Sequence, residues 1–436
     1  MHTASGPSAN RTDRGTVLAW SAWDWGSSAF NAVLVTFVFS VYLKDSVGKS
    51  IPDAAALYGT SMAVAGVLIA FVAPVQGRRT DVLGRRRQAV RVWTVITALL
   101  MTSLCFVRND APWYFWLGCA IMAVASVTFQ FAEVPYFAML SQVSTPATVG
   151  RVSGYGWAAG YFGGIFLLLL CYLGFIAGDG PTRGFLHVPI DAGLNIRLVA
   201  LLAAGWLLLF GLPVMFRVPE IPADPAAAGS YSPLEAYREL LAELGRLWRA
   251  DRNAVFFLGA AAVFRDGLAG VFTFGAILAV SVYEISAGDV LLFGVAANVV
   301  SALGALVAGY LDDFVGPKPV IVFSLLAMVI DCAVLYFVSG PKMFWIFGLI
   351  LCLFVGPAQS AARTFLTRVS PEGREGQMFG LYATTGRAVS WLAPGAFALF
   401  VAAFGSDRAG IAGIGLILAV GCLLMLAVSA PASRRP

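Results

Sequence analysis

The sequence contains few charged residues. Asp, Glu, Lys and Arg make up 12% of the 436 residues, whereas a soluble protein of this length carries about 25%. Hydrophobic residues make up 59% of the chain, which is more than a water-soluble fold can hide from solvent. The composition therefore excludes a soluble protein and predicts that most of the chain lies in a lipid bilayer.

Histidine and cysteine do not occur in metal-binding or catalytic arrangements. His2 and His187 are the only histidines, so the chain cannot form a histidine metal cluster or a buried histidine relay. The six cysteines fall in apolar stretches without a Cys-x-x-Cys pair, so we expect neither disulfides nor metal ligands. We accordingly expect no metal and no cofactor, with a proton or sodium gradient as the source of energy.

Motifs for nucleotide chemistry and for nucleophilic catalysis are missing as well. The sequence shows no phosphate-binding loop, nucleotide fingerprint or paired nucleophile and base. This argues against ATP-driven transport and against an enzyme. The net charge of +5 does not indicate a nucleic-acid partner, because what matters is which loops carry the basic residues.

Long apolar stretches dominate the chain instead. A membrane-spanning helix needs about 20 mostly apolar residues. Twelve stretches meet this requirement, at residues 17–42, 57–76, 89–107, 113–139, 152–176, 196–216, 254–282, 289–310, 319–338, 342–366, 377–403 and 409–429. The sequence thus predicts an all-α membrane protein with twelve transmembrane helices.

The basic residues predict how these helices are oriented. When loops are assigned alternately from an inside N-terminus, 19 of the 29 Lys and Arg residues fall inside and seven outside. The other three, Arg265, Arg363 and Arg387, fall within or close to the apolar stretches. Because cytoplasmic loops are enriched in Lys and Arg, we expect a multi-pass protein of the inner (cytoplasmic) membrane with both termini in the cytoplasm.

The apolar stretches form two groups of six. We expect a disordered N-terminus at 1–16, a six-helix bundle at 17–216, a cytoplasmic linker at 217–251, a second bundle at 252–430 and a tail at 431–436. In the linker, Ser232-Pro233-Leu234-Glu235 combines a capping box with Pro at the first helical position. The residues that follow predict an amphipathic helix, which lies on the cytoplasmic membrane surface or against the bundle; the alternative is a solvated linker helix.

A charged turn of the same design occurs once in each group. Both turns follow the pattern Gly-x-x-x-Asp-x-x-Gly with a basic residue just after it, at an offset of 232 residues. The expected gating residues are Gly77, Asp81, Gly84 and Arg85 in the first turn and Gly309, Asp313 and Gly316 in the second. Glycine permits close helix approach, and aspartate can accept hydrogen bonds from a helix N-terminus or an arginine. Such turns can latch two halves in one access state; the alternative is simple anchoring of basic residues in the cytoplasm.

A second repeat supports the division into halves. Residues 143–160 match residues 369–386, with Val-Ser followed by two glycines at equal spacing and an offset of 226 residues. Two matching patterns in the same order predict two pseudo-symmetric six-helix bundles, which is how many secondary transporters are built.

The repeated turn resembles the signature turn of the major facilitator superfamily, and the resemblance covers the whole twelve-span plan. A narrower resemblance, to the vacuole-effluxer-like branch, rests on three segments. These are Trp23-Asp24-Trp25-Gly26-Ser27-Ser28-Ala29-Phe30, Asp266-Gly267, and Arg151-x-Ser153-Gly154-x-Gly156-Trp157-Ala158-Ala159-Gly160-Tyr161. Trp23, Gly26 and the Gln130-Phe131-Ala132-Glu133 segment depart from the pattern of that branch. The resemblance implies the major facilitator fold and the export of amino acids, which fungal members move out of the vacuole.

Asp24 is the first candidate pathway residue. It lies several residues inside the first stretch, where a carboxylate is costly unless it faces a cavity or a partner. Ser28 and Asn31 follow at i+4 and i+7, so they share a helix face with Asp24. We expect this face to line the pathway. The alternative is that Asp24 lies at the cytoplasmic interface and caps nearby backbone.

Glu133 lies deeper, in the fourth stretch, with Gln130 on the same face. A buried carboxylate can bind and release protons near neutral pH because burial disfavours its charged form. Glu133 is therefore a candidate for proton or cation coupling. The alternative is a static ion pair with Arg265 or Arg387.

The remaining candidate pathway residues are three charged residues of the second half, together with Tyr155 of the fifth stretch. Arg265 and Asp266 mirror the position of Asp24, and successive helical residues point about 100° apart, so one can face the pathway and the other a neighbouring helix. Arg387 lies deep in the eleventh stretch and suits bidentate capture of a carboxylate or phosphate. A structural ion pair is the competing interpretation for Arg387.

We therefore expect a secondary active transporter that moves a small polar solute across the cytoplasmic membrane by alternating access, as a monomer in the bilayer. Amino-acid export is implied by the resemblance alone. The alternatives are a membrane receptor or scaffold that kept the fold but does not transport, and a major facilitator exporter of drugs or sugars. The intramembrane charges argue against the receptor, because a protein without transport has no need of costly buried charge.

Overall fold

The computed structural model describes residues 13–222, 242, 245, 248–249 and 252–431. Within these residues, twelve helices are long and apolar enough to cross a membrane. Each overlaps one of the twelve predicted stretches, so the prediction of an all-α membrane protein is confirmed. The predicted amphipathic helix of the linker falls almost entirely outside the described residues.

The first bundle is built from six spans, several of them composite. Its elements are α1 (Arg14–Ser28), η1 (Ala29–Phe37), α2 (Phe39–Val41), η2 (Tyr42–Val47), α3 (Ala54–Val82), α4 (Arg86–Ser103), η3 (Leu104–Phe106), α5 (Trp113–Ala138), α6 (Leu140–Val143), α7 (Val149–Cys171), η4 (Tyr172–Ile176), η5 (Asp191–Gly193) and α8 (Leu194–Arg217). The loop between η4 and η5 holds a short antiparallel hairpin of β1 (Thr182–Arg183) and β2 (Val188–Pro189), which the sequence did not predict.

The second bundle contains the other six spans. Its elements are α10 (Arg252–Ser281), α11 (Ala287–Val315), α12 (Pro317–Phe337), α13 (Pro341–Val369), α14 (Glu375–Val389), α15 (Leu392–Phe404) and α16 (Ala409–Ala427). Each bundle has its own apolar core, one formed by residues of the first half and one mainly by residues of the second.

The chain enters α1 earlier than expected. The Asp13 carboxylate caps the helix by accepting hydrogen bonds from the N–H groups of Gly15 at 3.2 Å and Thr16 at 3.0 Å. The Thr16 hydroxyl and these N–H groups stabilise the charged carboxylate, so the pKa of Asp13 lies below its ordinary value. The helix therefore begins at Arg14, which corrects the predicted disorder of residues 14–16; residues 1–12 lie outside the described part of the chain.

Two spans are interrupted in the middle. The first span changes from α-helix to π-helix over η1, a distortion that is frequent at functional sites. The eleventh span breaks at Ser390–Trp391, between α14 and α15. The Asp266 carboxylate of α10 accepts a hydrogen bond from the N–H of Ala393 at 2.6 Å, so Asp266 stabilises the start of α15.

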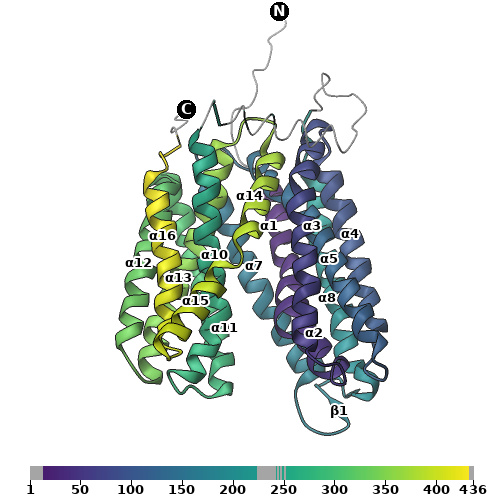
Figure 1. Ribbon diagram of the computed structural model, residues 1–436. Coiled ribbons are helices and arrows are strands. Elements are labelled where there is room, and N and C mark those ends of the chain that lie inside the picture. The colour runs from purple at the N-terminus through teal and green to yellow at the C-terminus, as the bar shows by residue number, and fades with distance from the viewer. Residues whose placement is uncertain (1–12, 223–241, 243–244, 246–247, 250–251, 432–436) are drawn as a thin grey trace, which may run out of the picture.

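The two bundles stand side by side, and α1 begins at the same end at which α16 ends (Figure 1). We call this end the terminal end and the opposite end, which carries the β1–β2 hairpin, the far end (Figure 1). The principal contacts between bundles join α3 to α14, α7 to α11, α7 to α13 and α5 to α14. The α3–α14 and α7–α11 pairs are equivalent under the predicted pseudo-symmetry.

The bundles are joined near the terminal end. Close approaches occur where Gly77 of α3 meets Gly376 of α14 and where Gly309 of α11 meets Gly150 of α7. A Cβ atom at Gly77 would lie 2.0 Å from the carbonyl oxygen of Gly376, so only glycine fits there. Toward the far end, the ribbons of the two bundles diverge (Figure 1).

Candidate functional site

The first charged turn joins the two bundles through Asp81. Its Oδ1 accepts a hydrogen bond from the N–H of Gly376 at 3.1 Å, and its Oδ2 accepts one from the N–H of Gln377 at 2.9 Å. These N–H groups belong to the first turn of α14, where the helix dipole favours negative charge. Asp81 therefore caps a helix of the opposite bundle.

Arg86 completes this contact. Its Nε donates to Asp81 Oδ1 at 2.7 Å, and its Nη2 lies 2.7 Å from Glu375 Oε2. The three side chains are only 1–8% exposed, so water screens their charges poorly. One arginine of the first bundle thus holds two carboxylates, one from each bundle.

The second turn repeats the capping geometry with Asp313 of α11. Its Oδ1 accepts from the N–H of Gly150 at 2.8 Å, and its Oδ2 accepts from the Arg151 Nε at 2.6 Å. Both donors lie at the start of α7. The neighbouring Asp312 is paired with Arg368 of its own bundle at 3.1 Å.

The glycines and the arginine of the turns have separate roles. Gly84 and Gly316 adopt positive φ angles of 61° and 85°, which only glycine adopts without strain, and they turn the chain from one span to the next. Arg85, which the sequence analysis included among the gating residues, is exposed. Arg86 lies buried in the contact instead, because α4 begins at this residue after the Gly84 turn.

A third contact between the bundles lies deeper, at Asp24. Arg363 of α13 reaches across from the second bundle and places Nη1 3.1 Å from Asp24 Oδ2. The same guanidinium donates from Nε to the Ser153 hydroxyl at 3.0 Å and from Nη2 to the Ser153 carbonyl at 2.6 Å. Arg363 is 2% exposed. The pathway prediction for Asp24 did not include this arginine, although the sequence analysis had placed Arg363 within or close to a span.

The surroundings of Asp24 are aromatic and hydrogen-bonded. Trp20 stacks on Tyr136 with ring centroids 4.8 Å apart. The two residues exchange hydrogen bonds, from Trp20 Nε1 to the Tyr136 carbonyl at 3.0 Å and from the Tyr136 hydroxyl to the Trp20 carbonyl at 3.1 Å. The alternative that Asp24 only caps nearby backbone is therefore not what the structure shows, because its carboxylate is paired with Arg363 of the other bundle.

Glu133 and Gln130 of α5 contact each other at mid-span. Gln130 Nε2 donates to Glu133 Oε2 at 2.7 Å, and both side chains are half-buried. Arg265 and Arg387 are near enough to act on Glu133 electrostatically. Within the described residues, neither arginine comes within the 4.0 Å of Glu133 that defines an ion pair, so the structure shows no static pair at Glu133.

The two arginines differ in how they are held. Arg265 stacks its guanidinium 3.8 Å from the ring centroid of Tyr382 and donates to the Tyr382 carbonyl at 3.2 Å. Arg387 is exposed, lies beside Gly66 of α3, and forms no ion pair with any described carboxylate. An arginine at this depth that is neither paired nor sealed in the core is available to an anionic group.

The remaining predicted pathway residues lie in different surroundings and do not form one cluster. Asp266 faces the break between α14 and α15, while the adjacent Arg265 faces Tyr382, as expected for successive helical residues. Ser28 is buried and donates to the Trp25 carbonyl at 2.7 Å, whereas Asn31 is exposed. Tyr155 hydrogen-bonds through its hydroxyl to Tyr310 of α11, so it belongs to the contact between bundles.

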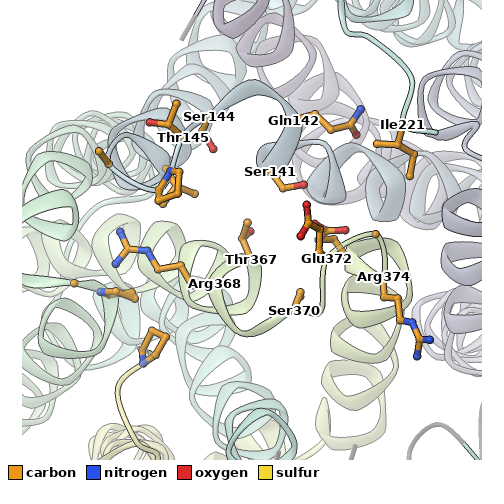
Figure 2. Close-up of a pocket in the computed structure, with 18 of the residues that line it drawn as sticks. Ser141, Gln142, Ser144, Thr145, Ile221, Thr367, Arg368, Ser370, Glu372 and Arg374 are labelled. Carbon is orange, nitrogen blue, oxygen red and sulfur yellow. The ribbon is translucent and has the colours of Figure 1, made fainter. Parts of the chain in front are cut away.

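A cavity of about 1210 Å³ opens between the bundles at the terminal end. Polar side chains of residues 141–145 face those of residues 367–374 across it (Figure 2). Its lining includes Asp81 and Asp313 but none of Asp24, Glu133 and Arg387. The mid-span residues therefore lie outside the lining of this cavity.

Solved structures share this architecture. The proton:xylose symporter XylE superposes with a TM-score of 0.74 at 13% identity, covering 95% of this chain and 96% of that one. The human organic anion transporter MFSD10 gives 0.72 at 14% identity, with 95% and 100% covered. FucP, solved in the outward conformation, gives 0.71 at 13% identity, with 96% and 99% covered. The protein thus has the fold of the major facilitator superfamily.

Sequence relatives narrow this class. The "Uncharacterized MFS-type transporter YxiO" of Bacillus subtilis (strain 168) is 22% identical over 413 residues, which cover 93% of each chain. The family model described as "Vacuole effluxer Atg22 like" matches residues 141–436, and the chain belongs to this family. It is a transporter of the major facilitator type and not an enzyme, as the sequence predicted.

The fungal relatives align with this chain over a shorter length than the Bacillus subtilis relative does. Autophagy-related protein 22-1 of Aspergillus fumigatus is 24% identical over 318 residues, which cover 65% of this chain and 49% of the relative. The chain therefore spans about half the length of the fungal proteins it matches.

Proposed function

We propose that the protein moves a small polar solute with a carboxylate group by alternating access, and that Arg387 binds this carboxylate. The observation that carries the proposal is an exposed arginine at mid-span that pairs with none of the described carboxylates and interacts electrostatically with Glu133 and Arg265. Such a charge is costly in a membrane unless water or a ligand reaches it. Arginine holds a carboxylate with two parallel hydrogen bonds, which favours it over lysine for this role.

Alternating access is supported by the uneven contacts between the bundles. They are latched at the terminal end and diverge toward the far end (Figure 1). The opposite state would require the Asp81, Asp313 and Asp24 contacts to separate. The solute is proposed to be an amino acid, as the sequence resemblance implies, and the direction export, in line with the family description "Vacuole effluxer Atg22 like".

The proposed membrane is the cytoplasmic membrane, with the terminal end and residues 217–251 in the cytoplasm. The support is the distribution of Lys and Arg between the loops. In intact cells, an impermeant thiol reagent should label a cysteine at position 182 and should not label one at position 228. Labelling at position 228 would contradict this topology.

Transport in proteoliposomes tests the proposed site. Arg387→Gln should lower the uptake of radiolabelled amino acids at least about tenfold, because the carboxylate loses a charged partner of about 1.5–3 kcal/mol. Arg108→Gln is the matched control, since Arg108 is an exposed arginine paired with Asp110 in a loop. Equal loss in both variants, or no loss at Arg387, would reject the carboxylate role.

Coupling to protons is proposed to involve Glu133. Glu133→Gln keeps the shape of the side chain but cannot titrate, so it should make net transport insensitive to a proton gradient while leaving solute exchange largely intact. Folded yield distinguishes this role from a structural one, because a stranded buried cation would lower the yield. Normal yield with an unaltered proton dependence would move the coupling role to Asp24 or Asp266.

A further inference from the structure

The contact around Arg363 has the composition of a binding site for an organic cation. Among the described residues, the hydrogen-bond, ion-pair and ring partners of the guanidinium all belong to the first bundle, whereas Arg363 itself belongs to the second. The arginine is therefore held in the first bundle much as a separate ligand would be.

Two kinds of contact define this site, which we call the Asp24 cage. Its polar groups are the Asp24 carboxylate at 3.1 Å, the Ser153 hydroxyl at 3.0 Å and the Ser153 carbonyl at 2.6 Å. Its aromatic rings are Trp20, Phe137 and Trp157, with centroids 4.8, 5.1 and 5.5 Å from the guanidinium carbon. Rings within about 6 Å of a cation attract it through their negative faces.

Part of the cage is held in place by contacts within the first bundle. Trp20 is locked against Tyr136 by stacking and by two hydrogen bonds. At Gly156, an added Cβ would lie 2.4 Å from Asp24 Oδ2 and 2.7 Å from Arg363 Nη2. Glycine at this position therefore leaves the space that the guanidinium occupies.

We infer that the Asp24 cage is a binding site for the guanidinium or ammonium group of a small organic cation, and that Arg363 occupies it as a tethered ligand in this access state. The inference rests on the proposed alternating access. When the bundles separate at the terminal end, Arg363 leaves with α13, and a carboxylate and three aromatic rings remain in the first bundle. A cationic ligand that binds there competes with Arg363 and holds the terminal end open.

Chemical rescue tests this inference without measuring transport. In purified Arg363→Ala, methylguanidinium should raise the unfolding temperature by at least about 2 °C, because a ligand that binds the folded state stabilises it. Methylurea, a neutral molecule of similar shape, and NaCl at equal ionic strength should give no such rise. The Arg363→Ala/Asp24→Asn double variant should lose the response, since the cage then lacks its charge.

Arg387→Ala is the matched control, because it also removes an intramembrane arginine but leaves no aromatic cage. A rise with methylurea, or an equal rise in Arg387→Ala, would overturn the inference.

If Arg363→Ala does not fold, a second measurement uses protein that retains Arg363. Spin labels at Ala147→Cys and Phe314→Cys, in a background without the six native cysteines, report the distance between bundles at the terminal end. Methylguanidinium should increase the population with the longer distance, and methylurea should not. An unchanged distance distribution overturns the inference. If amino-acid transport persists in proteoliposomes in that case, the proposed function stands and only the cation site fails.

Discussion

The two charged turns have the same capping geometry and different surroundings. Asp81 and Asp313 each accept hydrogen bonds from the first turn of a helix in the opposite bundle. The partner of Asp81, Arg86, is 1% exposed and also holds Glu375, whereas Arg151, the partner of Asp313, is 38% exposed. A buried charge network is costly to break, and a solvent-exposed pair contributes little. The two turns are therefore similar in sequence but unequal in strength: the Asp81 contact between the bundles is the stronger latch, and the Asp313 contact is the weaker one.

Removal of the shared arginine should have the largest effect. Arg86→Ala leaves Asp81 and Glu375 as two buried carboxylates on opposite bundles, and we expect the latched state to lose about 3–5 kcal/mol. Distances between spin labels placed on each bundle at the terminal end should shift toward the separated state, and the unfolding temperature should fall. A distribution like that of the unsubstituted protein would show that the Asp81 network does not hold the bundles together.

The close glycine contacts should be the next most sensitive. In Gly77→Ala, the new Cβ would lie 2.0 Å from a backbone oxygen of α14, which cannot move away without separating the helices. We expect a loss of about 1–3 kcal/mol, confined to the latched state. Gly309→Ala is the equivalent variant in the second turn, and its Cβ would lie 2.8 Å from the Gly150 oxygen. It should change cross-linking between the bundles less than Gly77→Ala does. A larger effect at Gly309 would reverse the ranking of the two latches.

The capping aspartates should follow. Asp81→Asn keeps one acceptor but loses the charge that Arg86 and the α14 N-terminus stabilise, so we expect about 2 kcal/mol and a shift of access states without loss of folding. Asp313→Asn should cost less, because its arginine is half-exposed to water. Cross-linking of cysteine pairs across the terminal end measures the shift of access states in both variants. Unchanged cross-linking in Asp81→Asn would leave only the anchoring role for the first turn.

The smallest effect is expected at Arg151. Arg151→Gln removes a pair whose arginine is 38% exposed, while the Asp313 carboxylate keeps the Gly150 N–H as a donor. The latched state should change by less than about 1 kcal/mol, and this difference should shrink further as salt concentration rises. An effect equal to that of Arg86→Ala would mean that exposure does not explain the difference between the turns.

The sequence located the intramembrane charges, whose roles in transport stay predictions, but it did not identify all of their partners. Asp24, Glu133, Arg265 and Arg387 were identified because charge inside an apolar stretch is costly and therefore conspicuous. The partner of Asp24 was not assigned, since Arg363 lies 339 residues away along the chain. In the first turn, the sequence pattern favoured Arg85 over Arg86, because a pattern does not say which of two adjacent arginines points into the contact.

The sequence by itself determined the solvent, the spans and the symmetry of this protein. Apolar stretches of sufficient length must span the bilayer, and an internal repeat must build similar bundles, so these features follow from local composition and spacing. Only the tertiary structure decided which charges meet. Asp24 with Arg363, Asp81 with the start of α14, and Asp266 with the start of α15 are contacts between distant segments, and they depend on how the helices pack at the terminal end and within the second bundle.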